Sequence, residues 1–278
     1  MVNNSGYKIH GWRHELWDVV RFFRSIGKNH KKLREFWLDY LRKENGLAVS
    51  TKKSKKTFKV LEHLPLKKET VQLFFDYLEY SEEMLVELTG CLRTEEQALR
   101  FCNRSGVEVD KTSTQSKDHH QSSKSLVAAV TNVAVYVAND LGLSIEQNPQ
   151  NRCVWLIENK LFVTARNLDG AIPALLNPYI IWEIKEYWGK TKGGSKMSDA
   201  VYECQLVGRE IREFEEESGI NICHVAFLDG RDQWGHRVSD FVRFIDLFNQ
   251  GIIDYLIVGK QVESDWENIL REVLNKSK

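Results

Sequence analysis

The sequence predicts an α/β protein in which a central mixed sheet flanked by helices follows a mainly helical N-terminal region. Up to residue 110, apolar residues recur at three- and four-residue spacing, as in amphipathic helices. From residue 125 onward, apolar strand-like runs alternate with helical patterns, which is typical of a sheet covered by helices. Between them, residues 111–124 contain no apolar side chain and predict a linker or mobile loop. We therefore expect three parts, at residues 1–110, 111–124 and 125–278.

The N-terminal part is predicted to be mainly helical and basic. Helices are expected at residues 12–23, 33–41, 68–89 and 94–103. Two short apolar runs within residues 47–61 could form a hairpin whose basic tip carries Lys52, Lys53, Lys55 and Lys56. Helices followed by such a hairpin suggest a winged-helix reader of DNA, and the alternative is a solvated lysine loop.

The charge of the chain is unevenly distributed. Lys and Arg number 39, as do Asp and Glu, so the formal net charge is zero. Residues 1–60, however, hold 15 basic and 5 acidic side chains, and the remainder of the chain is acidic. The zero net charge of the whole chain argues against a polyanion as partner, whereas the basic segment at residues 1–60 is suited to bind one.

The cysteines and the hydropathy indicate the compartment. The five cysteines are widely spaced and form no C-x-x-C, which argues against a disulfide framework and against a structural zinc site. The first residues lack the apolar core of a signal peptide, and no run of about 18 apolar residues could span a bilayer. We expect a soluble cytoplasmic protein without a membrane partner.

The C-terminal part is predicted to alternate strands and helices. Helices are expected at residues 126–141, 199–217, 238–249 and 265–274. Strands are expected at residues 154–157, 161–168, 179–184, 222–228 and 255–258. Residues 158–160 join the first two strands as a hairpin turn.

Two charged residues interrupt the most apolar strand. Glu183 and Lys185 are two positions apart, so their side chains leave the same face of the strand. Charged groups on a buried strand are costly unless they are paired or bound to a metal. Asp169, followed by Gly170, ends the preceding predicted strand and could place a second carboxylate beside Glu183. Two such carboxylates suit Mg²⁺, and a lysine beside them can stabilise charge that grows on a phosphate oxygen.

Asp169 followed by Glu183-Ile-Lys185 resembles the motif of the PD-(D/E)XK nucleases, the fold of many restriction endonucleases. The order of helix, antiparallel strands, helix and strand in residues 125–228 is also similar to the core of that family. Leu168 stands where the family's name-giving proline would be, a position at which the family is lax.

The resemblance implies a restriction-endonuclease-like core and a Mg²⁺-dependent endonuclease that hydrolyses double-stranded DNA, with Mn²⁺ as a possible substitute. Asp169, Glu183 and Lys185 would be catalytic, and the two acids would hold the metal. Several branches of the family bring a glutamine from the next helix to the active centre, which Gln205 would match; an exposed helix position is the alternative. A homodimer and a role in a restriction or phage-defence system are expected.

The segment between the motif strand and the next helix is glycine-rich and basic. Lys190, Lys192 and Lys196 suit contact with a phosphate backbone, although such a loop can also be a plain connection. A second Glu-x-Lys at residues 158–160 lies in a polar turn, where it needs no functional explanation. The alternatives to a nuclease are a non-catalytic DNA-binding protein on a similar core and an enzyme acting on a phosphorylated metabolite. The absence of both a P-loop and a G-x-G-x-x-G pattern weakens the last of these.

Overall fold

The structure, a computed structural model, describes residues 6–26, 35, 67–111, 122–189 and 194–276. It divides into two compact units, an N-terminal one at Tyr7–Met84 and a C-terminal one that contains Leu85–Lys278. The predicted helix at 33–41 and the predicted hairpin at 47–61 with Lys52, Lys53, Lys55 and Lys56 lie outside the described residues.

The N-terminal unit is built on two amphipathic helices. It contains a short 3-10 helix η1 (Lys8–His10), helix α1 (Leu16–Ile26) and most of helix α4 (Lys68–Cys91). Aromatic side chains of α1 and α4 form its core, with the rings of Phe23 and Phe74 stacked 4.8 Å apart between their centres. The helical pattern in the sequence therefore arises from one shared apolar interface.

The C-terminal unit begins earlier than the sequence pattern predicts. Helix α5 (Glu95–Arg104) packs on helix α6 (Ser125–Asp140), where the Cys102 thiol donates to the Ser125 carbonyl. Residues 85–110 therefore belong with the sheet domain rather than with the N-terminal helices. Lys111 and Ser123 form a β-bridge, so the two ends of the polar tract lie together in the C-terminal unit and the tract does not separate two domains.

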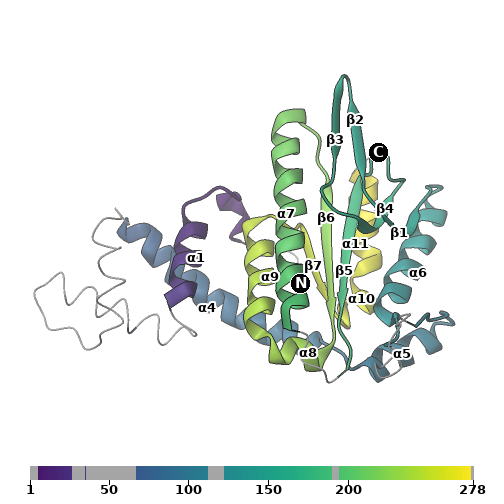
Figure 1. Cartoon of the computed structure of the whole chain (residues 1–278), viewed down its shortest axis with the longest axis horizontal. Helices are drawn as coiled ribbons and strands as arrows, with labels where there is room; N and C mark the ends of the chain where they lie inside the picture. The colour runs from purple at the N-terminus through teal and green to yellow at the C-terminus, as the bar shows by residue number, and fades with distance from the viewer. Residues whose placement is uncertain (1–5, 27–34, 36–66, 112–121, 190–193, 277–278) are drawn as a thin grey trace, which may run out of the picture. The chain divides into compact units, whose positions relative to one another are not determined.

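A five-stranded mixed sheet forms the centre of this unit (Figure 1). Its order is β1-β4-β5-β6-β7. The strands are β1 (Glu146–Asn151), β4 (Leu168–Ile172), β5 (Ile180–Glu186), β6 (Cys223–Asp229) and β7 (Tyr255–Val258). Strand β4 is antiparallel to both β1 and β5, whereas β5, β6 and β7 are parallel. Strands β2 (Val154–Ile157) and β3 (Lys160–Val163) form a separate antiparallel hairpin, as predicted.

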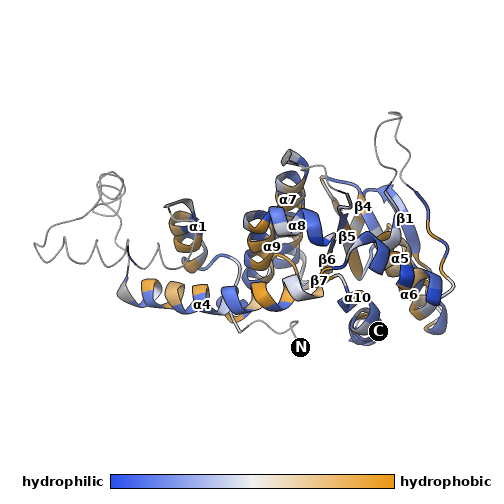
Figure 2. Ribbon diagram, turned by 90° about the horizontal axis from the view of Figure 1, so that it is seen from below, coloured by the Kyte–Doolittle hydropathy of each residue, from blue (hydrophilic) through white to orange (hydrophobic). Residues whose placement is uncertain are grey.

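Helices cover both faces of the sheet. The remaining helices are α7 (Gly194–Ser218), α8 (Arg231–His236), α9 (Val238–Gln250), α10 (Gln261–Ser264) and α11 (Trp266–Lys276). Figure 2 shows α7 and α9 on one side of the parallel strands and α6 and α10 on the other. Trp182 and Phe227 point into the core shared with α6 and α11, while Ile181 points into the core shared with α7. This confirms the predicted fold class of a mixed sheet flanked by helices after an N-terminal helical region.

The structure corrects one predicted strand. Residues 161–168 do not form a continuous strand, because β3 ends at Val163 and the chain enters the main sheet only at Leu168. Asp169 therefore lies near the start of β4 and not at the end of the strand before it. Because β4 is antiparallel to β5, its start lies beside the end of β5, where the predicted motif is found.

None of the helices that the structure describes is both long and apolar enough to cross a membrane. All five cysteines are free thiols.

Gly170 provides room for the largest side chain of the core. A Cβ atom at this position would lie 1.9 Å from the indole ring of Trp182, which is fully buried and packs edge-to-face on Trp266. We expect Gly170→Ala to destabilise the protein by about 1–3 kcal/mol, because a rigid buried ring has no free space to move into. The measurement is the midpoint of urea unfolding. Gly90→Ala is the control, since open space surrounds Gly90 in α4, and an equal shift for both variants would contradict the role of Trp182.

Candidate active site

The sheet brings Asp169, Glu183 and Lys185 together. Gly170 pairs with Trp182 in antiparallel register, so Asp169, one position before Gly170, and Glu183, one position after Trp182, both leave the opposite face of the sheet. The Asp169 carboxylate (Oδ2) accepts a hydrogen bond of 2.7 Å from the backbone N–H of Ile184, between the two charged residues of β5. The two predicted carboxylates and the lysine therefore belong to one cluster on the α7 side of the sheet.

Lys185 is held between two carboxylates. Its Nζ lies 2.9 Å from Glu183 Oε2 and 2.9 Å from Glu203 Oε2, and Glu203 comes from α7. Glu203 also pairs through Oε1 with the guanidinium of Arg166, at 2.6 Å. The lysine is thus fixed from the sheet below it and from the helix above it.

Glu183 is the most deeply buried member of the cluster. Its side chain is 2% exposed, and its Oε1 lies 3.3 Å from Nε2 of His224, which is itself completely buried on β6. His224 pairs with Ile181 in register, which places its ring on the same face as Glu183. His224 is therefore the second partner of the glutamate, beside Lys185.

A cavity of about 420 Å³ opens beside this cluster. Its wall is almost entirely polar, and Asp169, Lys185 and Glu203 contribute to it. Gln150 of β1 donates a 2.7 Å hydrogen bond to Asp169 Oδ1 at the cavity wall. A charged or strongly polar ligand could therefore reach Asp169 and Lys185, while Glu183 lies behind them.

The electrostatics of the two acids differ. Burial alone would raise the pKa of Glu183, but attraction to Lys185 and the hydrogen bond with His224 outweigh it and lower that pKa. The pKa of Asp169 is raised, because burial outweighs the hydrogen bond from Ile184 and the attraction of Lys185. For Lys185, burial lowers the pKa, but the pairing with Glu183 and Glu203 overcomes it and the pKa rises. Strongly perturbed groups beside a polar cavity are characteristic of functional sites.

The cluster could supply a divalent metal ion with only two carboxylate ligands, Asp169 and Glu183. Among the described residues, no group of three or more His, Cys, Asp or Glu side chains is arranged to hold a metal ion. Mg²⁺, however, commonly binds through one or two carboxylates and takes its other ligands from water and phosphate. Asp169, whose burial disfavours its charged form, would gain from a cation, and Glu183 would have to share the oxygen that now pairs with Lys185.

The structure does not bring Gln205 to this cluster. Among the described side chains, that of Gln205 makes no hydrogen bond, whereas Glu203 on the same helix contacts Lys185. Two residues apart on an α-helix correspond to about 200° of rotation, so both side chains cannot face one point. Glu203 and Glu210 are seven residues apart, which is about two turns of α7, so they lie on one face of that helix. Both contact the segment after β3, Glu203 at Arg166 and Glu210 at Ala165. This spacing is the signal in the sequence for the face of α7 that meets Lys185.

Of the predicted basic loop with Lys190, Lys192 and Lys196, the structure describes only the last lysine. Lys190 and Lys192 lie outside the described residues, and Lys196 is exposed near the start of α7. The hydroxyl of Tyr187 donates to the carbonyl of Lys196 at 3.3 Å, which connects the end of β5 to the start of α7. The phosphate contact assigned to these lysines stays a prediction.

Glu186 is the last residue of β5, and its side chain leaves the face of the sheet opposite to Glu183 and Lys185. Its burial predicts a pH dependence of stability that can be measured. Its Oε2 accepts hydrogen bonds from the Leu126 N–H, at the start of α6, and from the Trp188 indole. Burial raises its pKa from 4.5 to about 7, although both hydrogen bonds act in the other direction. The folded state therefore retains a proton that the unfolded state has lost, and we expect stability to fall as the pH rises from 4.5 to about 7.

The expected slope is at most about 1.4 kcal/mol per pH unit, and Glu186→Gln should flatten it. Chemical denaturation of both proteins across this pH range measures the effect. Glu158→Gln, in the exposed β2–β3 turn, controls for the loss of one carboxyl group. Equal pH dependence of the wild type and Glu186→Gln would contradict the assignment.

The fold and the cluster define a class of protein: an α/β domain with a polar ionisable site beside the ends of β4 and β5. The chain belongs to the family described as Domain of unknown function (DUF7687), which matches residues 87–273. The match begins close to the start of the C-terminal unit and covers the whole sheet and the site. No curated protein and no solved structure matched the chain.

Proposed function

We propose that the protein is a Mg²⁺-dependent endonuclease that hydrolyses phosphodiester bonds of DNA. The observation that supports this most is the convergence of Asp169, Glu183 and Lys185 in one cluster from two adjacent strands, with Asp169 and Lys185 at the wall of one cavity. The order of α6, antiparallel strands β1, β4 and β5, helix α7 and strand β6 agrees with the order that the PD-(D/E)XK resemblance implies.

The residues divide the work between binding and charge stabilisation. Asp169 and Glu183 would hold Mg²⁺, or Mn²⁺ in its place, which lowers the pKa of a bound water and so supplies a nucleophile near neutral pH. Lys185, fixed by Glu183 and Glu203, presents its ammonium group at the cavity wall. There it can stabilise the negative charge that develops on a phosphate oxygen. Glu203 and His224 act as positioning residues, because each orients one member of the cluster.

A finer assignment follows from the same proposal. We infer a restriction or phage-defence enzyme acting on double-stranded DNA in the cytoplasm. The basic region at residues 1–60 would contact phosphates, and a homodimer would cut both strands.

One observation favours a non-catalytic DNA-binding protein as the second candidate. Lys185, Glu183, Glu203 and His224 satisfy one another without any ligand, as a structural ion-pair network would. Such networks perturb pKa values as active sites do.

Incubation with supercoiled plasmid DNA, with Mg²⁺ or with a chelator, distinguishes the two. The proposed enzyme nicks or linearises the plasmid only when Mg²⁺ is present. A binding protein shifts the plasmid in a gel under both conditions and leaves it intact, which would refute the nuclease.

A further inference from the structure

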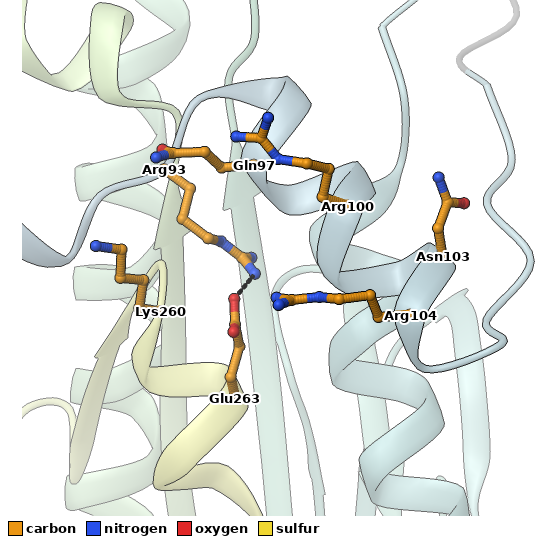
Figure 3. Close-up of a pocket in the computed structure, with 7 residues that line it drawn as sticks. All are labelled: Arg93, Gln97, Arg100, Asn103, Arg104, Lys260 and Glu263. Carbon is orange, nitrogen blue, oxygen red and sulfur yellow. Dashed lines mark hydrogen bonds and ion pairs between the residues drawn. The ribbon is translucent and has the colours of Figure 1, made fainter.

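A second cavity lies in the C-terminal unit, between α5 and α10, and is separate from the proposed active site. It has a volume of about 440 Å³ and is lined by Arg93, Gln97, Arg100, Asn103, Arg104, Lys260 and Glu263 (Figure 3). None of these residues lines the cavity beside Asp169 and Lys185. It lies just beyond β7, since Lys260 follows that strand by two residues. The carboxyl edge of parallel strands is where open α/β sheets bind ligands.

The lining of this cavity is strongly basic. It contains four cationic side chains and a single acid, Glu263, which is already paired with Arg93 Nη1 at 2.8 Å. Among the described residues, neither Arg104 nor Lys260 has a carboxylate partner. Figure 3 shows the guanidinium groups of Arg93 and Arg104 turned toward each other beside the Glu263 carboxylate. Arg100, Arg104 and Lys260 are exposed, so the positive charge gathered at this cavity is accessible to an anion from solution.

Arg93 gives an independent indication of a ligand. Its side chain is 1% exposed and is anchored by Asp229 through Nε at 2.7 Å. Its Nη2, however, is buried and has no hydrogen-bond partner. Buried polar atoms are nearly always hydrogen-bonded, and an exception requires an explanation such as an absent ion. The rigidly held guanidinium of Arg93, which lines this cavity, therefore has an unused donor.

We propose that this cavity binds a phosphate monoester. A terminal phosphate carries up to two charges and three free oxygens, which match the planar fork of an arginine and several further cations. The cavity exceeds what an inorganic anion fills and lies within the range of small-molecule sites, about 300–1,000 Å³. The phosphate is therefore carried by a larger body, and the amides of Gln97 and Asn103 can hydrogen-bond to that body. A nucleotide and the end of a nucleic-acid strand share this chemistry.

Calorimetric titration of the full chain in a chelator tests the proposal, since the chelator stops metal-dependent cleavage. The probes are inorganic phosphate, ATP, and one duplex oligonucleotide carrying either a 5′-phosphate or a 5′-hydroxyl. We expect Arg104→Gln/Lys260→Gln to weaken binding of the preferred phosphate probe about tenfold or more. Arg93 is not substituted, because it also holds the fold together. Arg271→Gln is the control, since that arginine lies on α11 and pairs with Asp140 and Glu267.

Two outcomes support the proposal and assign the source of the phosphate. Preference for ATP indicates a nucleotide, and preference for the 5′-phosphorylated duplex over its 5′-hydroxyl form indicates a strand end. The proposal is overturned if no probe binds, if the double variant binds as tightly as the wild type, or if both duplexes bind equally while phosphate and ATP do not. Cleavage is not the readout, so a failure of the nuclease assignment leaves this result interpretable.

Discussion

Lys185→Ala is expected to reduce Mg²⁺-dependent cleavage of plasmid DNA by a factor of about 10²–10³ or more, while DNA binding persists. Among the described residues, Lys185 is the one cation that contacts both Glu183 and Glu203, so its loss would remove the ammonium group proposed to stabilise the phosphate charge. Asp169→Asn and Glu183→Gln should have effects at least as large, because each would remove a proposed negative ligand of the metal while keeping the shape of the side chain. Cleavage rates and gel-shift affinities are the two measurements.

The chain contains its own control for this experiment. Lys160 belongs to the second Glu-x-Lys of the sequence and is the exposed first residue of β3. Lys160→Ala should cleave at the wild-type rate. Thermal unfolding of each variant separates lost chemistry from lost structure. Wild-type cleavage by a folded Lys185→Ala would remove this residue from the mechanism, and cleavage by all three variants would remove the site.

Arg93→Ala is expected to cost about 3–5 kcal/mol of unfolding free energy, the largest stability effect that the structure suggests. Arg93 and Asp229 are 1% and 0% exposed, and the Asp229 carboxylate accepts hydrogen bonds from both the Nε and the backbone N–H of Arg93. Burial raises the pKa of Asp229, and the arginine acts against that rise. Without Arg93, a buried carboxylate would lose its only cationic partner among the described residues.

Urea unfolding measures this loss. The control is Lys276→Ala, which breaks an exposed pair with Glu272 on α11 and should change stability very little. If the two variants unfolded at the same urea concentration, the buried pair would not hold α5 to the end of β6. A restored midpoint in Arg93→Met/Asp229→Leu would show that the interior tolerates an apolar replacement, as buried ion pairs often do.

The periodicity of the sequence was sufficient to predict most elements of the C-terminal unit. The reason is that apolar runs such as residues 222–228 and 255–258 are buried on both faces between helices, so composition and structure coincide. Strand β1 could not be predicted, because Glu146–Asn151 is wholly polar, contains a proline, and holds Asn148 and Gln150 at positive φ. It is a strand only because β4 offers it an edge.

The grouping of the candidate site residues, as distinct from their function, was predicted in part. The spacing of Glu183 and Lys185 fixes their common face, and a buried charged pair demands a partner, which led to Asp169. The spacing of residues along one strand does not reveal which residues from distant segments of the chain complete the cluster. Glu203 and His224 join it through the rotation of α7 and the register of β6, and both are set by packing of the whole core. The predicted domain boundary at residue 110 was wrong for the same reason. Residues 85–110 join the C-terminal unit partly through the pair of Arg93 with Asp229, which lies 136 residues further along the chain.

The partners of Arg93 have a consequence for synthesis of the protein on the ribosome. Asp229 and Glu263 follow Arg93 by 136 and 170 residues. At about 5–20 residues per second, translation reaches Glu263 on the order of 10–30 s after Arg93 is made. During that interval the nascent chain carries an arginine whose final environment does not yet exist. The two ion pairs of Arg93 can therefore be completed only after residue 263 has been made, although α6, on which α5 packs, is made earlier.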